Sequence, residues 1–528
     1  MTSTQINQGN YTAYQPYMLL NFDYSFQNDV LDDDLSVTIL EVLGRINLNK
    51  FIDFHNLDSR SYDPVMMLTI ILMAFAEDGY ASLRKLEKLC RYDIRYRSIK
   101  NGCVPSYKSF ERFINHTLKE SIQTIAKEIY LYVQDEKALE EQILYIDGTK
   151  FEANANKMTF CWKGWSKRYL PRHWQKCMEL LKQVNRYFKK HEININYSIL
   201  KYPNIEYMIK IDEALENWLK EKEYIRKGRG KHEIAKLCDE LKKSAVKMWE
   251  YAIQEDILED RNSFSKTDPD ATFMHMKYDY YNHTNVFKPG YNIQTGVSDG
   301  IIRNIYISSD GNDINTYIPF MEKYYEAYGS YPKKTPADAG YGSFDNYSYC
   351  KEHNIELYMK YAGYYKEKEK TNEKNRFKKT HMKRTEDGGF ICPAGYEFEI
   401  EKVTIDSRSN YDKINFLFRN NKCGECPLRN KCTKSKSGRT IVHSYQMEEY
   451  QKEVKRNIRS EDGIRLMYQR SNETEGTFGD WKNNHQFERL HRRGENGVKL
   501  EIYLVAIGHN IRKYHRYKIQ KQKTEKVN

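Results

Sequence analysis

The stretch Leu144–Ala153 constrains the fold most, because its apolar residues run directly into the acidic residue Asp147 and then Gly148. A short apolar run of this kind is typical of a buried β-strand. We expect the strand to deliver Asp147 to its end, with Gly148 allowing a ligand backbone to come close. Asp-Gly also marks ordinary turns, so the interpretation depends on matching carboxylates elsewhere.

Two later segments supply such carboxylates. Asp338 stands at the end of an expected strand beside glycines, and Glu475 lies on an expected helix. Three carboxylates that converge on one site can hold two Mg²⁺ or Mn²⁺ ions for phosphodiester chemistry, because these hard cations prefer oxygen ligands. Asp310 and Asp313 compete for the second position, and Glu473 competes for the third.

Tyr468, Glu475 and Lys482 stand seven residues apart, so they share one face of the expected helix. Lys482 is placed to hold a phosphate oxygen, and Tyr468 and Arg470 are placed to do the same. Gly476 and a second glycine one turn later cost about 1 kcal/mol each relative to alanine. A closely passing ligand or backbone would account for them, and a frayed helix is the alternative.

The charge balance favours a nucleic-acid partner. The 528 residues carry 85 Lys and Arg against 73 Asp and Glu, a net charge of +12. A basic but inert surface is the alternative. The longest apolar run, Val65–Ala76, is shorter than the ~20 residues a membrane span needs. The N-terminus lacks the charged-then-apolar design of a leader, so we expect a cytoplasmic protein without a membrane partner.

The first third of the chain reads as helical. Pro64 follows Asp63 as a capped helix start, Ser82–Arg91 is amphipathic, and Pro105–Phe113 opens another helix. A helix, a turn and a second helix with polar residues early on its outer face fit a helix-turn-helix DNA reader. A helical bundle with solvated charges fits equally well. The candidate DNA contacts here are Tyr107, Lys108 and Arg112.

The middle of the chain reads as a mixed α/β sheet. Residues 292–297 and 301–308 predict a hairpin around Asp299-Gly300, followed by a helix at Tyr317–Tyr328 and a strand at Ile355–Tyr361. Alternation of these elements with Asp147 and Asp338 at strand ends favours an α/β core. Residues 160–265 are helical and charged, and we interpret them as an insertion.

Four of the ten cysteines cluster late in the chain. They are Cys392, Cys423, Cys426 and Cys432. The C-x2-C spacing, with a third and a fourth cysteine in the same region, predicts a tetrahedral thiolate Zn²⁺ site with a structural role. Four unrelated reduced thiols are the alternative.

The C-terminal part is strongly basic. His485–Arg493 supplies the candidate DNA contacts Arg489, Arg492 and Arg493, and the last residues from Arg512 onward form a cationic tail.

Three motifs together resemble the DDE transposases of bacterial insertion sequences. They are Tyr145–Asn156, Ala337–Ser343 and Glu475–Lys482, the last similar to the Tyr-Arg-Glu-Lys signature of that family. Residues 35–115 resemble the helical N-terminal domain of one such group, which also has a cysteine-rich insertion before the third acid. Two departures stand out. Pro336 interrupts the expected second strand, which should therefore be short or at an edge. Tyr468 and Arg470 are closer than the family's Tyr-x2-Arg spacing, which leaves the role of Arg470 doubtful.

The resemblance implies a domain order. An N-terminal helical DNA-binding domain (1–127) precedes an RNase H-like core, a mixed sheet flanked by helices. That core is built from 128–159, 266–362 and 446–515, and it is interrupted by the helical insertion (160–265) and a zinc-ribbon-like insertion (363–445). A basic tail (516–528) follows.

The resemblance also implies an activity. Asp147, Asp338 and Glu475 would bind two Mg²⁺ ions, Lys482 would assist, and the enzyme would cut at terminal inverted repeats and join 3′-ends to target DNA. A homodimer or higher oligomer is expected, because two element ends must be held together, and the enzyme would act at the bacterial nucleoid. The alternatives are an RNase H-like nuclease without strand transfer and a domesticated DNA-binding protein.

Overall fold

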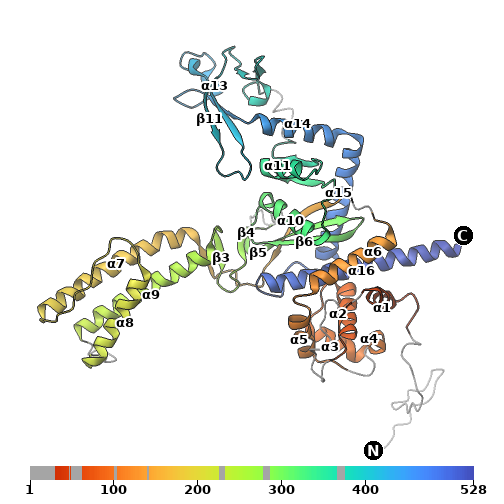
Figure 1. Ribbon diagram of the computed structural model, residues 1–528, viewed down its shortest axis with the longest axis horizontal. Helices are drawn as coiled ribbons and strands as arrows, with labels where there is room; N and C mark the ends of the chain where they lie inside the picture. Colours follow the sequence, from red (N-terminus) through yellow and green to blue (C-terminus); the bar gives the residue numbers. More distant parts are fainter. Residues whose placement is uncertain are drawn as a thin grey trace, which may run out of the picture.

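A computed structural model of the chain describes residues 30–46, 48, 62–99, 104–139, 142–224, 232–276, 286–365 and 375–527. Residues 1–29, with which the expected N-terminal domain begins, lie outside the described residues. Figure 1 shows a central sheet with the N-terminal helices below it, a helical arm (163–258) reaching to the left and a lobe (375–443) at the top.

The central sheet combines antiparallel and parallel pairing. Strand β1 (Tyr145–Glu152) pairs antiparallel with β5 (Phe287–Ser298), which also pairs antiparallel with β6 (Ile301–Ser308) and, at its start, with β4 (Thr272–His275). On the other side of β1, the amides of Leu144 and Ile146 donate to the carbonyl oxygens of Lys334 and Pro336. These bonds place β1 beside β7 (Ala337–Gly342), which runs parallel with β8 (Met359–Tyr361).

The resulting order across the sheet is β6-β5-β1-β7-β8, which confirms the expected mixed α/β class. The predicted hairpin is present, and both of its turn residues have positive φ, 50° at Asp299 and 73° at Gly300. A two-residue turn with positive φ at both positions is the type I′ geometry that suits the twist of paired strands.

Helices cover both faces of the sheet. On one face, apolar side chains of β5 and β6 pack against α6 (Ile122–Lys137) and α16 (Glu495–Val527). On the other face, Leu144 and Ile146 pack with α10 (Tyr317–Tyr328), α11 (Phe344–Glu352) and α14 (Tyr445–Arg459). Helix α10 has the bounds that the sequence predicted.

The N-terminal helices share the core of the sheet. They are α1 (Leu35–Arg45), α2 (Pro64–Asp78), α3 (Leu83–Tyr92), α4 (Ile94–Ile99), α5 (Tyr107–Arg112) and a π-helical turn (Phe113–Thr117). Helix α2 begins as predicted, with the Asp63 carboxylate accepting from the amides of Val65 and Met66. A Cβ at Gly508 of α16 would stand 2.6 Å from the carbonyl carbon of Phe75, so α2 and α16 are in direct backbone contact.

The arm has a core of its own. Strands β2 (Phe160–Trp162) and β3 (Ser263–Ser265) pair at its base, and α7 (Lys163–Lys190), α8 (Ile205–Glu221) and α9 (Glu233–Leu258) pack around buried residues such as Trp174 and Leu241.

The upper lobe is built on a three-stranded antiparallel sheet. Its strands are β11 (Glu399–Ile405), β12 (Ile414–Arg419) and β13 (Thr440–His443). The lobe also holds the short pair β9 (Lys383–Arg384) and β10 (Phe390–Ile391), and the short helix α13 (Arg429–Cys432). Three 3₁₀ turns complete the elements described, at Asp313–Asn315, Lys379–His381 and Asn421–Cys423.

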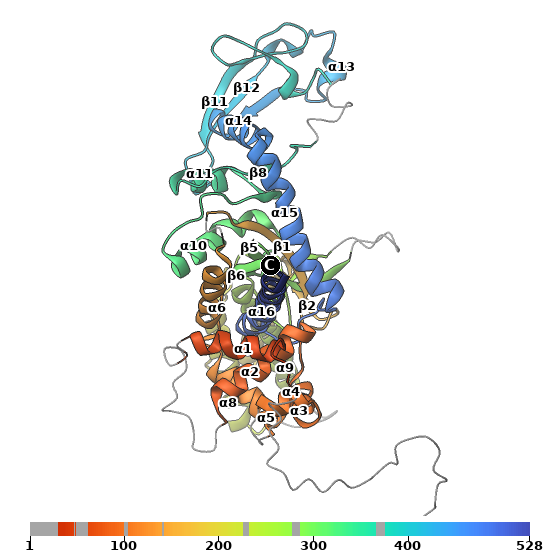
Figure 2. The same cartoon turned by 90° about the vertical axis from the view of Figure 1, so that its right-hand side faces the viewer.

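Helix α15 (Glu461–Gly479) connects the lobe to the central sheet. It follows α14 after a break at Ser460 and ends in a π-helical turn (Asp480–Asn484). Figure 2 shows it running down beside β1, where the Tyr145 hydroxyl donates to Gln469 Oε1 at 2.7 Å.

In the described ranges, no single helix is long and apolar enough to cross a membrane. The bent pair of helices α2 and α3 has the length and composition of a membrane span, but most of α2 is buried in the core.

Candidate active site

Asp147 is the third residue of β1 and pairs in register with Thr295 of β5. It therefore lies near the beginning of the strand, and the expectation that it ends the strand is wrong. A Cβ at Gly148 would stand 2.3 Å from Gln294 Nε2, so this glycine makes room for the Gln294 side chain.

Asp338 is the second residue of β7, the strand beside β1. Its Oδ1 accepts a hydrogen bond from the Gly340 amide at 2.7 Å, so it is not a helix N-cap. The strand is short, as Pro336 predicted. It is not at an edge, because β1 and β8 flank it on both sides.

The two aspartates are electrostatically coupled. Burial raises the pKa of Asp147 to about 6, and the negative charge of Asp338 adds to the rise. The positive charge of Arg470 and a hydrogen bond from Thr474 oppose it. A buried carboxylate whose ionisation is disfavoured by burial and by an aspartate on the adjacent strand forms a site that a cation would stabilise.

A third carboxylate, Asp313, lies next to them. It accepts hydrogen bonds from Asn292 Nδ2 at 2.7 Å and Gln294 Nε2 at 3.0 Å. A Cβ at Gly340 would stand 2.9 Å from Asp338 Oδ1 and 3.5 Å from Asp313 Oδ2. The other competing acid, Asp310, is engaged in its own turn by the Asn312 amide and the Asn315 side chain.

The surroundings of Tyr341 show that the three aspartates lie in one region. Its hydroxyl donates to Gln294 Oε1. Burial raises the pKa of Tyr341 well above its ordinary value, and the charges of Asp313, Asp147 and Asp338 raise it further.

Helix α15 brings Arg470 and Thr474 to this site. Arg470 Nη1 lies 3.5 Å from Asp147 Oδ2, with 13% of the arginine side chain exposed. Glu475 is exposed and makes no hydrogen bond or ion pair with the described residues. The competing Glu473 is bound by the Gly300 amide, at the hairpin.

The structure thus places two of the three expected acids, Asp147 and Asp338, on adjacent strands. No group of three His, Cys, Asp or Glu side chains in the described parts of the chain is close enough to hold a metal ion. The space beside Gly476 is open, and no backbone passes close to it.

Lys482 forms hydrogen bonds with β1. Its Nζ donates to Thr149 Oγ1 at 2.6 Å and to the Lys150 carbonyl oxygen at 3.0 Å, two and three residues after Asp147. The ammonium also lies 4.7 Å from the centroid of the Phe151 ring.

The four clustered cysteines line one small cavity in the upper lobe, with a volume of about 20 Å³. All four are free thiols. Arg439 contacts two of them, since its amide donates to Cys423 Sγ at 3.4 Å and its Nη1 lies 3.7 Å from Cys432 Sγ. They too fall short of the closeness that a metal centre needs.

The residues expected to contact DNA differ in their solvent exposure and in their contacts within the protein. Lys108 and Arg112 of α5 and Tyr468 of α15 are exposed, whereas Tyr107 is half-buried beneath the guanidinium of Arg84. Three arginines near the C-terminus contact the protein itself: Arg489 reaches Glu152, Arg492 donates to Asn115, and Arg493 donates to the Asn154 carbonyl oxygen.

The expected cationic tail is part of α16, and Arg512 does not belong to a DNA-binding tail. Arg512 is buried and donates to Asp480 Oδ2 and to the Ala76 carbonyl oxygen.

Residues 391–515 match a family model described as a transposase DDE domain. The match covers 125 of the 528 residues, so this part of the chain is similar to that family. The similarity supports the resemblance to DDE transposases. The domain match begins after Asp147 and Asp338 and contains Glu475, Lys482 and the four cysteines. Neither the curated proteins nor the solved structures gave a significant match.

Sequence reasoning missed several polar residues around the candidate site. Asn292 and Gln294 alternate on β5, and that period-2 spacing of amides in an otherwise apolar strand was the available signal. Thr474 carried no signal, because its role depends on how α15 lies on β1.

Proposed function

We propose that the protein is a DNA transposase that cleaves DNA at terminal inverted repeats and joins the 3′-ends to target DNA. One observation carries the proposal: Asp147 and Asp338 are coupled on adjacent strands, beside a helix that belongs to the transposase DDE domain. The three acids Asp147, Asp338 and Glu475 remain our proposed active-site set.

The strand order supports an RNase H-like core. Strands β1, β5 and β6 pair antiparallel in the order β6-β5-β1, and β7 and β8 add in parallel on the other side of β1. This arrangement places Asp147 and Asp338 on neighbouring strands, as the resemblance to DDE transposases implies.

The residues present fit a hard divalent cation. Asp147 and Asp338 offer carboxylate oxygens on adjacent strands, and a bound cation would offset the burial that disfavours the ionised form of Asp147. Asp147, Asp338 and Glu475 would hold Mg²⁺ or Mn²⁺, which would activate a water or a 3′-hydroxyl and stabilise the leaving oxygen. Arg470 meanwhile stabilises the ionised form of Asp147, and Lys482 fixes the α15 end against β1.

DNA is the proposed partner of the basic surfaces. A net charge of +12 and the exposed Lys108 and Arg112 on α5 support duplex binding by the N-terminal helices. Because two element ends must be held together, the active form is a dimer or a higher oligomer.

A structural Zn²⁺ in the upper lobe is a further part of the proposal. Four thiols, two of them in a C-x2-C pattern, line one cavity, and thiolate ligands suit zinc. Their side chains would have to move closer together to bind the ion. Lys422 and Arg439 also line this cavity.

A joining assay tests the proposal. The full chain is incubated with Mg²⁺, a plasmid and a duplex that ends in the inverted repeat found beside the gene. A transposase yields plasmid covalently joined to the duplex. Cleaved duplex without joined product would favour a nuclease, and binding without cleavage would favour a domesticated DNA-binding protein. Either outcome overturns the proposal.

A further inference from the structure

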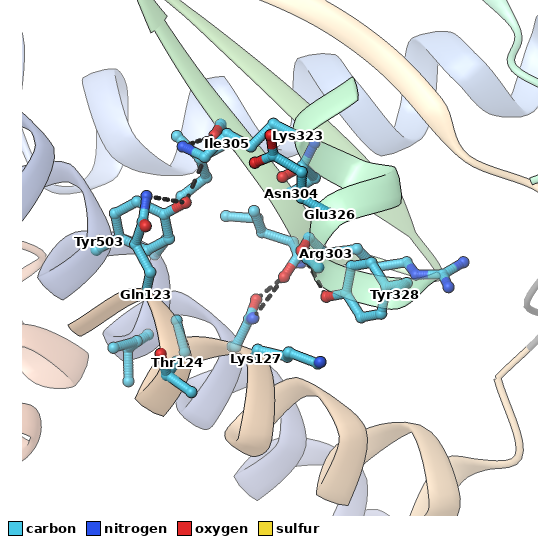
Figure 3. Close-up of a pocket in the computed structure, with 16 residues that line it drawn as sticks. Gln123, Thr124, Lys127, Arg303, Asn304, Ile305, Lys323, Glu326, Tyr328 and Tyr503 are labelled. Atoms are coloured by element: carbon cyan, nitrogen blue, oxygen red, sulfur yellow. Dashed lines mark hydrogen bonds between the residues drawn. The ribbon is translucent and has the colours of Figure 1, made fainter. Parts of the chain in front are cut away.

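One cavity of the central domain lies away from the aspartates, at the β6 edge of the sheet. Its volume is about 280 Å³, and α6, β6, α10 and α16 form its walls. Figure 3 shows Lys127 from α6 and Lys323 from α10 on opposite sides of it, with Tyr503 and Tyr328 at its flanks. Strand β5 separates this edge from β1, so the cavity is distinct from the candidate active site.

The cavity holds more positive than negative charge. Lys127, Arg303 and Lys323 line it, and Glu326 is the one carboxylate among its lining residues. Arg303 is largely buried and lies within 5.0 to 5.5 Å of the ring centroids of Tyr130, Tyr324 and Tyr328. The faces of these aromatic rings stabilise the charge of Arg303.

Lys323 is the residue of the cavity that most favours a bound anion. Its Nζ donates to the Ile305 carbonyl oxygen at 2.8 Å and lies 5.3 Å from the Tyr503 ring centroid. No carboxylate oxygen of the described residues lies within 4 Å of this ammonium. Burial lowers the pKa of Lys323 to about 8, and the charge of Lys499 lowers it further. The charges of Glu495 and Glu326 partly oppose this lowering without an ion pair at contact distance, so the buried ammonium favours a bound anion.

Lys127 also has no ion pair with a carboxylate of the described residues. Its ammonium lies 5.7 Å from the centroid of the Tyr328 ring. The remaining walls supply neutral donors, including the Gln123 amide and the Thr124 hydroxyl. Two lysines, an arginine and neutral donors around an open volume are the groups that bind a phosphate.

We propose that this cavity binds a phosphate group between Lys323 and Lys127. The group is either that of a small phosphorylated molecule, which a cavity of this size accommodates, or a backbone phosphate of bound DNA. The inference does not rest on the transposase activity, because it uses none of the active-site residues.

Protection of Lys323 from acylation tests the site in the wild-type chain. An amine-acylating reagent at pH 8 modifies Lys323, whose pKa lies near that value, and peptide mass spectrometry measures the extent. Inorganic phosphate or pyrophosphate should lower modification of Lys323 at least fivefold while the exposed Lys119 is unchanged. Equal labelling of Lys323 with and without these anions would overturn the proposal.

Calorimetric titration with pyrophosphate gives a second measurement. Lys323→Met keeps the alkyl stem, and it should weaken pyrophosphate binding at least tenfold, whereas Lys119→Met should leave it unchanged. The same variants are then titrated with a 30-base-pair duplex. Weaker duplex binding by Lys323→Met alone, relieved by competing pyrophosphate in the wild type, assigns the phosphate to DNA. Unchanged duplex binding assigns it to a small molecule. Pyrophosphate binding that is equal in wild type and Lys323→Met would refute the site.

Discussion

Arg470 Nη1 lies 3.5 Å from Asp147 Oδ2, and this ion pair joins helix α15 to the first strand of the sheet. The sequence spacing between Tyr468 and Arg470 had left the role of Arg470 doubtful. In the structure Arg470 is the cation nearest to the most perturbed carboxylate of the site, whereas Tyr468 is 71% exposed. Arg470 therefore supplies positive charge where the proposed metal ion would bind.

Removal of Arg470 should make the protein depend on a divalent cation for stability. Arg470→Gln leaves a buried carboxylate unpaired, and we expect the free energy of unfolding to fall by about 1–3 kcal/mol, below the 3–5 kcal/mol of fully buried pairs because both groups are partly exposed. Mg²⁺ should then raise the melting temperature more in Arg470→Gln than in the wild type, since a ligand that binds only the folded state stabilises it.

The matched control for that experiment is Arg465→Gln, which removes a surface arginine from the same helix. Arg465 Nη2 pairs with Asp462 at 2.6 Å, and more than half of its side chain is exposed. Its loss should cost less than about 1 kcal/mol. A response to Mg²⁺ that is the same in the two variants would contradict the placement of Arg470 at the metal site.

Neutralising Asp147 should not cost stability. Burial and the charge of Asp338 outweigh the attraction of Arg470, because the pKa of Asp147 is raised on balance, unlike that of Asp480. Asp147→Asn therefore replaces a disfavoured ionised carboxylate with a neutral group of the same shape. We expect the free energy of unfolding in urea, without divalent cations, to stay equal or rise by about 1 kcal/mol. A loss of more than about 2 kcal/mol would show that the ionised Asp147 is a structural group.

A second buried ion pair should be essential to the fold. Asp480 accepts hydrogen bonds from His509 Nδ1 and Asn484 Nδ2, both at 3.0 Å, and from Arg512. Asp480→Asn leaves Arg512 buried without its partner, so we expect a loss of about 3–5 kcal/mol in urea unfolding. Asp462→Asn, which breaks a surface pair, is the control and should cost about 1 kcal/mol or less.

The same carboxylate predicts a pH dependence. Burial alone would raise the pKa of Asp480, but the hydrogen bonds from His509 and Asn484 and the charge of Arg512 outweigh burial and hold the pKa far below its ordinary value of 3.8. A lowered folded-state pKa gives stability that is fully present above pH 4 and is lost as the pH falls further. The stability difference between wild type and Asp480→Asn should therefore shrink from pH 5 to pH 3. A constant difference would contradict this assignment.

The upper lobe should contain zinc. Purified chain, washed free of loosely bound metal, should carry one zinc per chain by atomic emission, and Cys426→Ser should lose it, because a tetrahedral site does not keep its affinity with three thiolates. Cys161→Ala, which changes a buried cysteine of the arm, should keep the zinc. Zinc-free wild type that is as stable as the purified protein would refute the proposed site.

Local sequence patterns predicted the local structure. Asp299-Gly300 gave the hairpin because both residues tolerate positive φ, and Asp63-Pro64 gave the start of α2 because the aspartate caps and the proline fits the first turn. Asp147 and Asp338 could be recognised as strand acids from the apolar residues and glycines around them. These features depend on a few neighbouring residues.

Features that depend on tertiary packing could not be predicted from the sequence. The contact between Gln294 and Gly148 requires the register of β1 against β5, and the Arg470 ion pair requires the rotation of α15 on β1. Arg512 looked like part of a basic tail, because only the packing of α16 on α2 shows that it is buried. Glu475 and Lys482 share a helical face by spacing, yet Lys482 is bound to β1 and Glu475 is not.

The most direct test of the central claim compares DNA joining by wild type, Asp147→Asn, Asp338→Asn and the neighbouring Asp310→Asn, each with Mg²⁺ and the inverted-repeat duplex. If Asp147 and Asp338 hold the catalytic cation, both of their variants should lose at least about a thousandfold in joining rate while still binding the duplex. Asp310→Asn should keep the wild-type rate, since that carboxylate closes a surface turn. Joining by Asp147→Asn and Asp338→Asn at the rate of Asp310→Asn would contradict the account.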